Sequence, residues 1–415
     1  MQRDGPRGTI PPPSERHRAG PRWPLQVIVG LLVVAAALFG MRLLRHPSEP
    51  APQDSGRSPA ESVDVAHPGV AREPAPIRPA AASVLDGEFM ARLRLADTHR
   101  LLGDIGVSAD VLALLAEQRL AEAARALDTQ ARANDRTAVV ALARLAHACT
   151  SGAPDTPGAT ESDFSHAAQR ARDLSTEARL RIEASITFIR ERRATMKKAC
   201  ADTRFDAQAI ADRLRRAAAA GDEMSLWELG NEASAEAQRK HWTSAAMLGY
   251  VPAQVSLAQS LMSENLDNDP RLRDQLSFWL TSAARQSPRG KTMLAECMLN
   301  GCGVKPPDGS TAASLLEEAV LSGTAEALAP LQSIGGDDPA APTDAQLFSL
   351  NAFLQRLNER GCYGEFYPGY AVNSHENQQQ LALRLSPSGL EEAQRLTDGY
   401  WRDHGAQALS TLHCN

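Results

Sequence analysis

The stretch LAECMLNGCGVKPPDGSTAASLLEEAVLSGTAEA, residues 294–327, decides the fold, because it joins the end of one helical pattern to the next through a glycine turn. Its segment LLEEAVLSG (315–323) ends on small residues, and the same helix end recurs upstream as RLRRAAAAG (213–221), HWTSAAMLG (241–249) and WLTSAARQS (279–287). The last residues of these segments, Gly221, Gly249, Ser287 and Gly323, lie 28, 38 and 36 residues apart. This period indicates a repeated structural unit.

Each unit has the same internal pattern. A bulky or long side chain is followed four residues later by an alanine, at Ala217, Ala245, Ala283 and Ala319. Small residues let a second helix approach closely, and a terminal glycine can adopt the left-handed conformation that ends a helix. Second helical patterns follow as YVPAQVSLAQSLMS, PRGKTMLAECMLNG and TAEALAPLQSIGG. Two helices per unit predict an all-α fold with an α-solenoid.

The stretch 294–327 resembles a Sel1-like repeat, whose pattern is roughly LGxxYxxGxGVxxDxxxAxxWYxxAAxxGxxxA. With one extra residue after Val304, the matching positions are Leu294, Gly301, Gly303, Val304, Asp308, Ala312, Ala319, Gly323 and Ala327. The preceding unit keeps Trp279 and Ala283 but lacks the GxGV turn. We place the repeats at 205–335. The resemblance implies a right-handed superhelix similar to tetratricopeptide arrays, in a family of adaptor and scaffold proteins that are often exported in bacteria and generally lack a catalytic centre.

Helical patterns also flank the repeats. Residues 85–204 predict a helical N-terminal region, with an amphipathic stretch over 108–135 and one long polar helix from about Glu161 to Ala201. Residues 336–415 predict a C-terminal helical cap that covers the open end of the solenoid. Within the cap, residues 361–385 hold three of the five tyrosines and have poor helix chemistry, so we allow for a short strand there.

The N-terminus has the pattern of an exported or anchored protein. A basic tail (1–23) precedes the apolar run Leu25–Met41, which at about 1.5 Å per residue spans about 25 Å of the ~30 Å hydrocarbon core. We therefore expect an uncleaved transmembrane helix at 24–45. A cleaved signal peptide is an alternative, because Ala35–Ala37 would suit a cleavage enzyme, and a core helix is a third.

Charge and composition predict on which side of the membrane the rest of the chain lies and how it is organised. The arginines before the apolar run predict a cytoplasmic N-terminus and a periplasmic body anchored in the inner membrane. Residues 46–84 are rich in Pro, Ala and Ser and predict a disordered linker. The first 46 residues have a formal charge of +5, so the remainder carries −6 − 5 = −11. An acidic body argues against nucleic acid as the main partner.

Six cysteines in a chain with such an N-terminus suggest disulfides. Fifteen pairings are open, and we favour neighbours in sequence: Cys149–Cys200, Cys297–Cys302 and Cys362–Cys414. Free structural thiols and a metal site are the alternatives. A metal site has little support, because Cys297 and Cys302 have no second cysteine pair at ligand spacing.

One group of residues is a candidate for catalysis, because a thiolate beside an imidazole can act as a nucleophile: Cys362 with His375, Asp403, His404 and His413. No motif for nucleotides, dinucleotides, zinc proteases or serine hydrolases occurs in the chain, and we expect no cofactor and no enzymatic activity. The favoured function is a scaffold that binds a protein or peptide of the cell envelope. A polysaccharide- or cell-wall-binding protein and a hydrolase using the C-terminal region are the alternatives.

Overall fold

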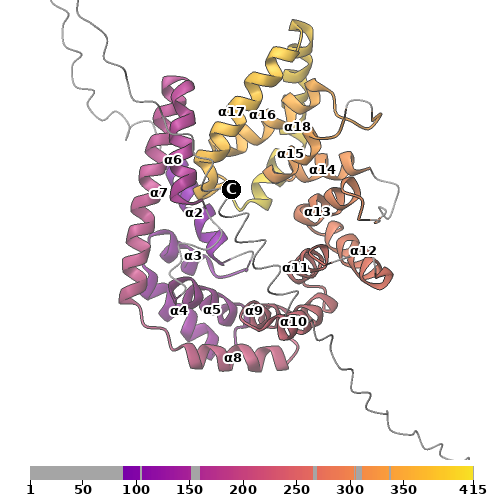
Figure 1. Cartoon of the computed structure of the whole chain (residues 1–415). Coiled ribbons are helices and arrows are strands. Elements are labelled where there is room, and N and C mark those ends of the chain that lie inside the picture. The colour runs from indigo at the N-terminus through magenta and orange to yellow at the C-terminus, as the bar shows by residue number, and fades with distance from the viewer. Residues whose placement is uncertain are drawn as a thin grey trace, which may run out of the picture. The chain divides into compact units, whose positions relative to one another are not determined.

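The structure is a computed structural model of the 415-residue chain. It describes residues 87–102, 105–150, 159–264, 269–302, 304, 311–335 and 338–414. All regular elements in these ranges are helices, so the described chain is all-α (Figure 1). None of these helices is both long and apolar enough to cross a bilayer. The transmembrane helix expected at 24–45, with its flanking segments 1–23 and 46–84, lies outside the described residues.

The N-terminal region is a set of packed helices. They are α2 (Gly87–Leu102), α3 (Ala109–Ala116), α4 (Leu120–Arg132), α5 (Arg136–Thr150), α6 (Glu161–Arg170), the short 3-10 helix η2 (Ala171–Asp173) and α7 (Thr176–Asp202).

The amphipathic stretch 108–135 divides into α3 and α4 at a turn that contains no glycine. Gln118 has a φ of +62°, and the N–H of Arg119 donates to the carbonyl of Leu114 over 2.8 Å. Together with the N–H of Gln118 donating to Leu115, this is the hydrogen-bond pattern that normally ends a helix at a left-handed glycine. Because Gln118 rather than a glycine adopts the left-handed conformation here, the sequence does not predict this helix end.

The single long helix expected from Glu161 to Ala201 is wrong, because the chain reverses between α6 and α7. Ser175 begins α7, and its side chain accepts a hydrogen bond from the N–H of Ala178 at 3.2 Å. Thr160 and Asp163 form a capping box at the start of α6. A serine whose side chain accepts a hydrogen bond from the N–H three residues later is a signal for the start of a helix. Ser175 therefore marks the break between α6 and α7.

The repeat region forms four successive helix pairs. They are α8 (Ala207–Ala219) with α9 (Glu223–Asn231), α10 (Ala235–Met247) with α11 (Val251–Met262), α12 (Pro270–Ala284) with α13 (Pro288–Leu299), and α14 (Ala312–Leu321) with the 3-10 helix η4 (Ala325–Ala327) and α15 (Leu328–Gln332). Neighbouring helices pack against one another along the series.

The spacing from alanine to glycine has a structural explanation. Gly221, Gly249 and Gly323 have φ values of +85°, +96° and +94°, directly after the first helix of a pair. In each case the N–H after the glycine donates to the carbonyl of the repeated alanine: Asp222 to Ala217, Tyr250 to Ala245 and Thr324 to Ala319, over 3.0–3.1 Å. The repeat signature is therefore a helix-ending turn in which the alanine carbonyl is the acceptor.

The third unit departs from this pattern. Ser287 has a φ of −138° and begins α13, where its hydroxyl accepts from the N–H of Gly290. The helix end expected at 279–287 is present, because α12 ends at Ala284 and the N–H of Ser287 donates to the carbonyl of Ala283 over 2.8 Å, without a left-handed residue. Gly301, with a φ of +79°, follows the end of α13, and Gly303 lies outside the described residues.

The repeated alanine is buried in three of the four pairs. Ala245, Ala283 and Ala319 have no exposed surface, whereas Ala217 is half-buried. In the third pair α13 also approaches α12 closely at Gly290, where an added Cβ would lie 2.4 Å from the carbonyl carbon of Ala283. The missing side chain at Gly290 is thus required by contact with the backbone of α12.

The N-terminal region joins the repeats through α5, which packs on α8 and α9. Arg144 of α5 donates to Glu228 of α9 with an Nε–Oε2 distance of 3.0 Å, and its guanidinium lies 4.9 Å from the Trp227 ring centroid. Burial raises the pKa of Glu228, an effect larger than the opposite one of Arg144. The two regions are therefore linked through a buried ion pair.

The C-terminal region contains α16 (Asp344–Glu359), the 3-10 helix η5 (Gly364–Phe366), α17 (Tyr367–Arg384) and α18 (Pro387–Thr411). The short strand allowed for at 361–385 is wrong, since most of this segment is α17. Pro368 lies in the first turn of α17, where a missing N–H breaks no helical hydrogen bond. Helices α16 and α18 pack on α14, so this region covers the last repeat pair.

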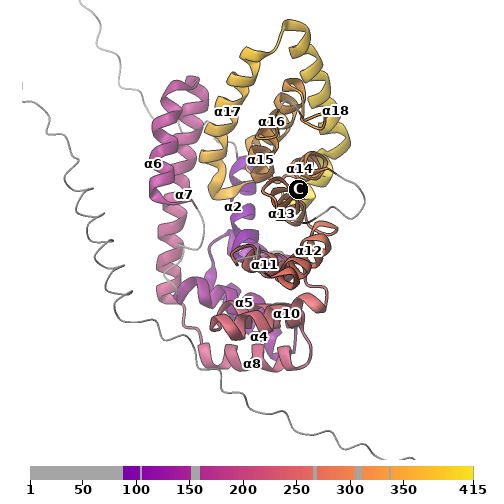
Figure 2. The same ribbon diagram turned by 45° about the vertical axis from the view of Figure 1, so that its right-hand side comes forward.

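Helix α17 also returns to the beginning of the described chain, as Figures 1 and 2 show. It packs against α6 and α7, while η5 packs against α2. Phe89 and Tyr367 meet edge to face with ring centroids 5.0 Å apart. Arg170 of α6 forms an ion pair with Glu376 and donates to Asn373 over 2.8 Å. The C-terminal region therefore contacts both ends of the helical array.

Candidate functional site

The cysteines form three disulfides with the favoured pairing. Cys149–Cys200 joins the ends of α5 and α7, and Cys297–Cys302 spans the end of α13. Cys362–Cys414 joins the turn before η5 to the residues after α18. No cysteine of the described chain is free.

The residues considered for catalysis do not assemble into a reactive group. The sulfur of Cys362 is bonded to Cys414, so it offers no thiolate. His375 contacts the carbonyl of Ala371 at 2.7 Å, and the ring of His413 stacks on that of His99. Asp403 pairs with its neighbour Arg402, and His404 lies partly buried on α18. In the described ranges no three His, Cys, Asp or Glu residues gather as a metal site would need.

The repeats and the C-terminal region form the walls of an open cavity of about 730 Å³, which we call the inner cavity. Helices α11 and α13 form one side, and the turn after α14, η5, the start of α17 and Leu412 form the other. Its apolar lining consists of Met262, Met293, Tyr363, Phe366, Tyr370 and Leu412. The polar lining includes Gln259, Arg289, Thr292, Glu296 and Glu326.

Two tyrosines build the C-terminal wall of the inner cavity. The Tyr363 hydroxyl donates to the carbonyl of Gly323 over 3.0 Å, and the Tyr370 hydroxyl donates to Oε1 of Glu326 over 2.8 Å. The two rings meet edge to face with centroids 4.8 Å apart. Burial raises the pKa of both phenols, so both remain neutral hydrogen-bond donors at physiological pH.

Gly323 has a second role that the repeat pattern does not reveal. Besides its left-handed φ, an added Cβ would lie 2.9 Å from a side-chain carbon of Leu412. The end of the chain thus packs directly on the last repeat turn. The disulfide Cys362–Cys414 joins two segments of this C-terminal wall, because Cys362 precedes Tyr363 and Cys414 lies two residues after Leu412.

The charged side chains that line the inner cavity differ in whether they already have a partner within the protein. Glu326 accepts a hydrogen bond from Tyr370. Arg289 is exposed in the first turn of α13, and it makes no ion pair with any acid in the described part of the chain. Arg289 is therefore a cation available to a ligand that enters the cavity.

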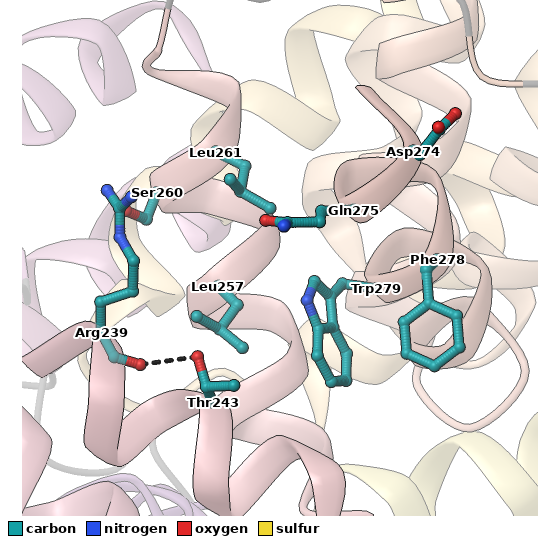
Figure 3. A pocket seen from close by; sticks show the side chains of 9 residues that line it. All are labelled: Arg239, Thr243, Leu257, Ser260, Leu261, Asp274, Gln275, Phe278 and Trp279. Carbon is teal, nitrogen blue, oxygen red and sulfur yellow. Dashed lines mark hydrogen bonds between the residues drawn. The ribbon is translucent and has the colours of Figure 1, made fainter. Parts of the chain in front are cut away.

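A second hollow of about 430 Å³ lies between α10, α11 and α12 (Figure 3). Arg239 and Thr243 stand on one side and Trp279 on the other, with Leu257 between them. Thr243 donates to the Arg239 carbonyl over 2.7 Å, and the Arg239 guanidinium pairs with Glu264. The cation of this groove is already engaged, so we take the inner cavity as the candidate site.

The tryptophans of the repeat region share one environment. Trp227, Trp242 and Trp279 are only partly buried, and all three pack on the core cluster of Ala245 and Leu257. No sequence pattern marks Met262, Met293 or Arg289 as cavity residues. The cluster of tyrosines at 363–370 is the one sequence signal for the site.

No family model and no curated protein matches this chain. Among solved structures, it is similar to a protective antigen present in uropathogenic Escherichia coli strains that displays an SLR (Sel1-like repeat) fold. The identity is 17% and the TM-score is 0.40, over 71% of this chain and 59% of that one. The chain therefore spans about three-fifths of the length of that protein.

Proposed function

We propose that this protein is a membrane-tethered, extracytoplasmic scaffold whose inner cavity binds a peptide segment of another envelope protein. The observation that carries the proposal is the inner cavity itself, a space of about 730 Å³ between the repeat helices and the C-terminal helices. Ligand cavities of a few hundred Å³ with an apolar lining and few polar groups are the usual form of a binding site.

The lining fits an apolar peptide side chain. Met262 and Met293 offer flexible thioether side chains that adapt to different shapes. Tyr363 and Tyr370 offer aromatic edges whose hydroxyls are already anchored. Arg289 on the rim would attract a carboxylate of the bound segment. Because disulfide and hydrogen bonds hold the wall, little ordering would be needed on binding.

Two further features support the location. Three disulfides are typical of proteins outside the reducing cytoplasm. The N-terminal 84 residues combine a basic tail, an apolar run and a Pro/Ala-rich spacer, as expected for an anchor with a tether.

An envelope polysaccharide is the second candidate ligand, favoured by the aromatic wall formed by Tyr363, Phe366 and Tyr370.

Photo-crosslinking in cells tests the proposed site. A photoreactive phenylalanine derivative at Met262 in the inner cavity should capture a protein, whereas the same group at Leu383, an exposed position on α17, should not capture it. Arg289→Glu should weaken capture, and Arg285→Glu, an exposed arginine at the end of α12, serves as the matched control. Equal capture by the two charge variants, or by the two labelled positions, would contradict the proposal.

The location has its own test. Protease added to the outside of spheroplasts should degrade the body of the full chain and leave a short membrane-bound fragment containing residues 1–23. Mass spectrometry of that fragment separates an uncleaved anchor from a cleaved signal peptide. A body that is protected until the membrane is lysed would refute the extracytoplasmic assignment.

A further inference from the structure

Helix α13 presents one continuous stripe of side chains to the inner cavity. Its members lie at positions i, i+3, i+4 and i+7 of the helix, and they are Arg289, Thr292, Met293 and Glu296. Residues seven apart are separated by about 10 Å along a helix axis, because each residue advances about 1.5 Å. The stripe therefore has a cation near the start of α13 and a carboxylate about 10 Å further along, with a threonine and a methionine between them.

Neither charge at the ends of the stripe has an ion-pair partner in the part of the chain that the structure describes. Arg289 is exposed, and Glu296 is half-buried in the lining of the cavity. Lys291, the other cation of α13, pairs with Glu318 of α14 over 2.6 Å and is therefore not available to Glu296. A half-buried carboxylate has lost part of its hydration, and the cation of a ligand can replace it with a charge-assisted hydrogen bond.

The other side of the inner cavity adds negative charge. Its described lining includes Glu326, whose carboxylate accepts a hydrogen bond from Tyr370, and it includes no lysine or arginine. The described lining as a whole thus holds two acids, Glu296 and Glu326, against one base, Arg289. A ligand with only acidic and apolar groups would leave Glu296 unpaired, whereas a ligand that also carries a cation would pair with it.

We propose that the inner cavity selects a peptide segment of mixed charge, in which an acidic group meets Arg289 and a lysine or arginine side chain meets Glu296. A separation of about 10 Å corresponds to about three residues of extended chain, so an apolar residue between the acid and the base would contact Met293. The inference rests on the proposed function, and it adds the charge pattern of the partner.

Selection from a random heptapeptide library displayed on phage tests this charge pattern. The bait is the full chain in detergent, beside its variants Glu296→Lys and Arg289→Glu. The control variant is Glu391→Lys, which changes an exposed acid of α18 outside the cavity. The wild type and the control should enrich peptides that contain both an acid and a base. Glu296→Lys should enrich peptides that contain acids alone, and Arg289→Glu should enrich peptides that contain bases alone.

A synthetic copy of one enriched peptide then measures the ion pair directly. Glu296→Gln should weaken its binding about tenfold, and so should replacement of the peptide's base by glutamine. The two changes together should weaken binding little more than either alone, because both remove the same ion pair. The melting temperature of Glu296→Gln should match that of the wild type, since Glu296 has no ion-pair partner in the described chain to lose.

The possible results separate this inference from the proposed function. Enriched peptides without a base would overturn the inference, and so would losses that multiply in full when Glu296→Gln meets the altered peptide. If Arg289→Glu still abolished binding of those peptides, the proposed function would stand alone. A wild type that enriches no peptide over the empty matrix would overturn both, and binding of a fluorescent N-acetylglucosamine oligomer would then favour a polysaccharide.

Discussion

Gly290→Ala examines how closely the two helices of one repeat pair approach. The added Cβ would lie 2.4 Å from the carbonyl carbon and 2.5 Å from the carbonyl oxygen of Ala283, where about 3.4 Å is an ordinary contact. Both opposing atoms are backbone, so α12 and α13 would have to separate by about 1 Å. Overpacking of this kind costs about 1–3 kcal/mol, and we expect about 3 because no flexible side chain can move aside. The gain in helix propensity returns up to about 1 kcal/mol, which leaves a net loss of about 2 kcal/mol.

Gly399→Ala is the matched control. It lies within α18, where the nearest atom to the added Cβ would be a guanidinium nitrogen of Arg402 at 3.8 Å. This variant should gain about 0.5–1 kcal/mol from propensity alone. Urea unfolding followed by circular dichroism measures both changes against the wild type. If Gly290→Ala were as stable as the wild type, the close packing at Ala283 would not exist as described.

Three further outcomes are expected. Tyr363→Phe removes a buried donor to a carbonyl of the last repeat turn, and should lower the free energy of unfolding by about 1–3 kcal/mol; an unchanged value in urea unfolding would contradict the hydrogen bond. Replacing Cys149 and Cys200 by serine opens a loop of 51 residues and should cost about 4 kcal/mol on the loop-entropy model, measured in the same way. The hydrogen bond from Arg170 holds the pKa of Glu376 below its usual range, so its stabilising contribution exists above about pH 4.3 and is lost as the pH falls through the folded-state pKa. The difference in melting temperature between the wild type and Glu376→Gln should therefore shrink from pH 7 to pH 3, and a constant difference would contradict the assignment.

The regular parts of the fold could be predicted because they depend on local signals. The alanine and glycine of each repeat belong to one turn, and their spacing is fixed by a hydrogen bond across five residues, as at Ala245 and Tyr250. The disulfides were predicted on a different ground, the pairing of successive cysteines along the chain, although two of the pairs are 51 and 52 residues apart. Ser287 follows the end of α12, as its alignment with Gly221, Gly249 and Gly323 predicts, but the alignment does not show that it also begins α13 with a φ of −138°.

The candidate site could be predicted only in small part. Its residues come from α11, α13 and the C-terminal region, and nothing local in the sequence links Met262 to Tyr370. The break at Gln118 was hidden for a different reason, because a non-glycine residue adopts the left-handed conformation there. The hydrogen bonding of buried asparagines is also set by their surroundings: Asn358 Oδ1 has no partner in the described chain, whereas Asn351 Nδ2 on the same helix donates to Ser374 and Gln378.

The contact of α17 with α6 and α7 limits how this protein can change in length. In an open array each helix pair touches only its neighbours, so a duplicated or deleted pair alters the reach of the array and little else. Here an added or lost pair would shift the C-terminal helices away from the N-terminal ones, separating Arg170 from Glu376 and Phe89 from Tyr367. Homologues should therefore vary within their loops while keeping the number of helix pairs constant.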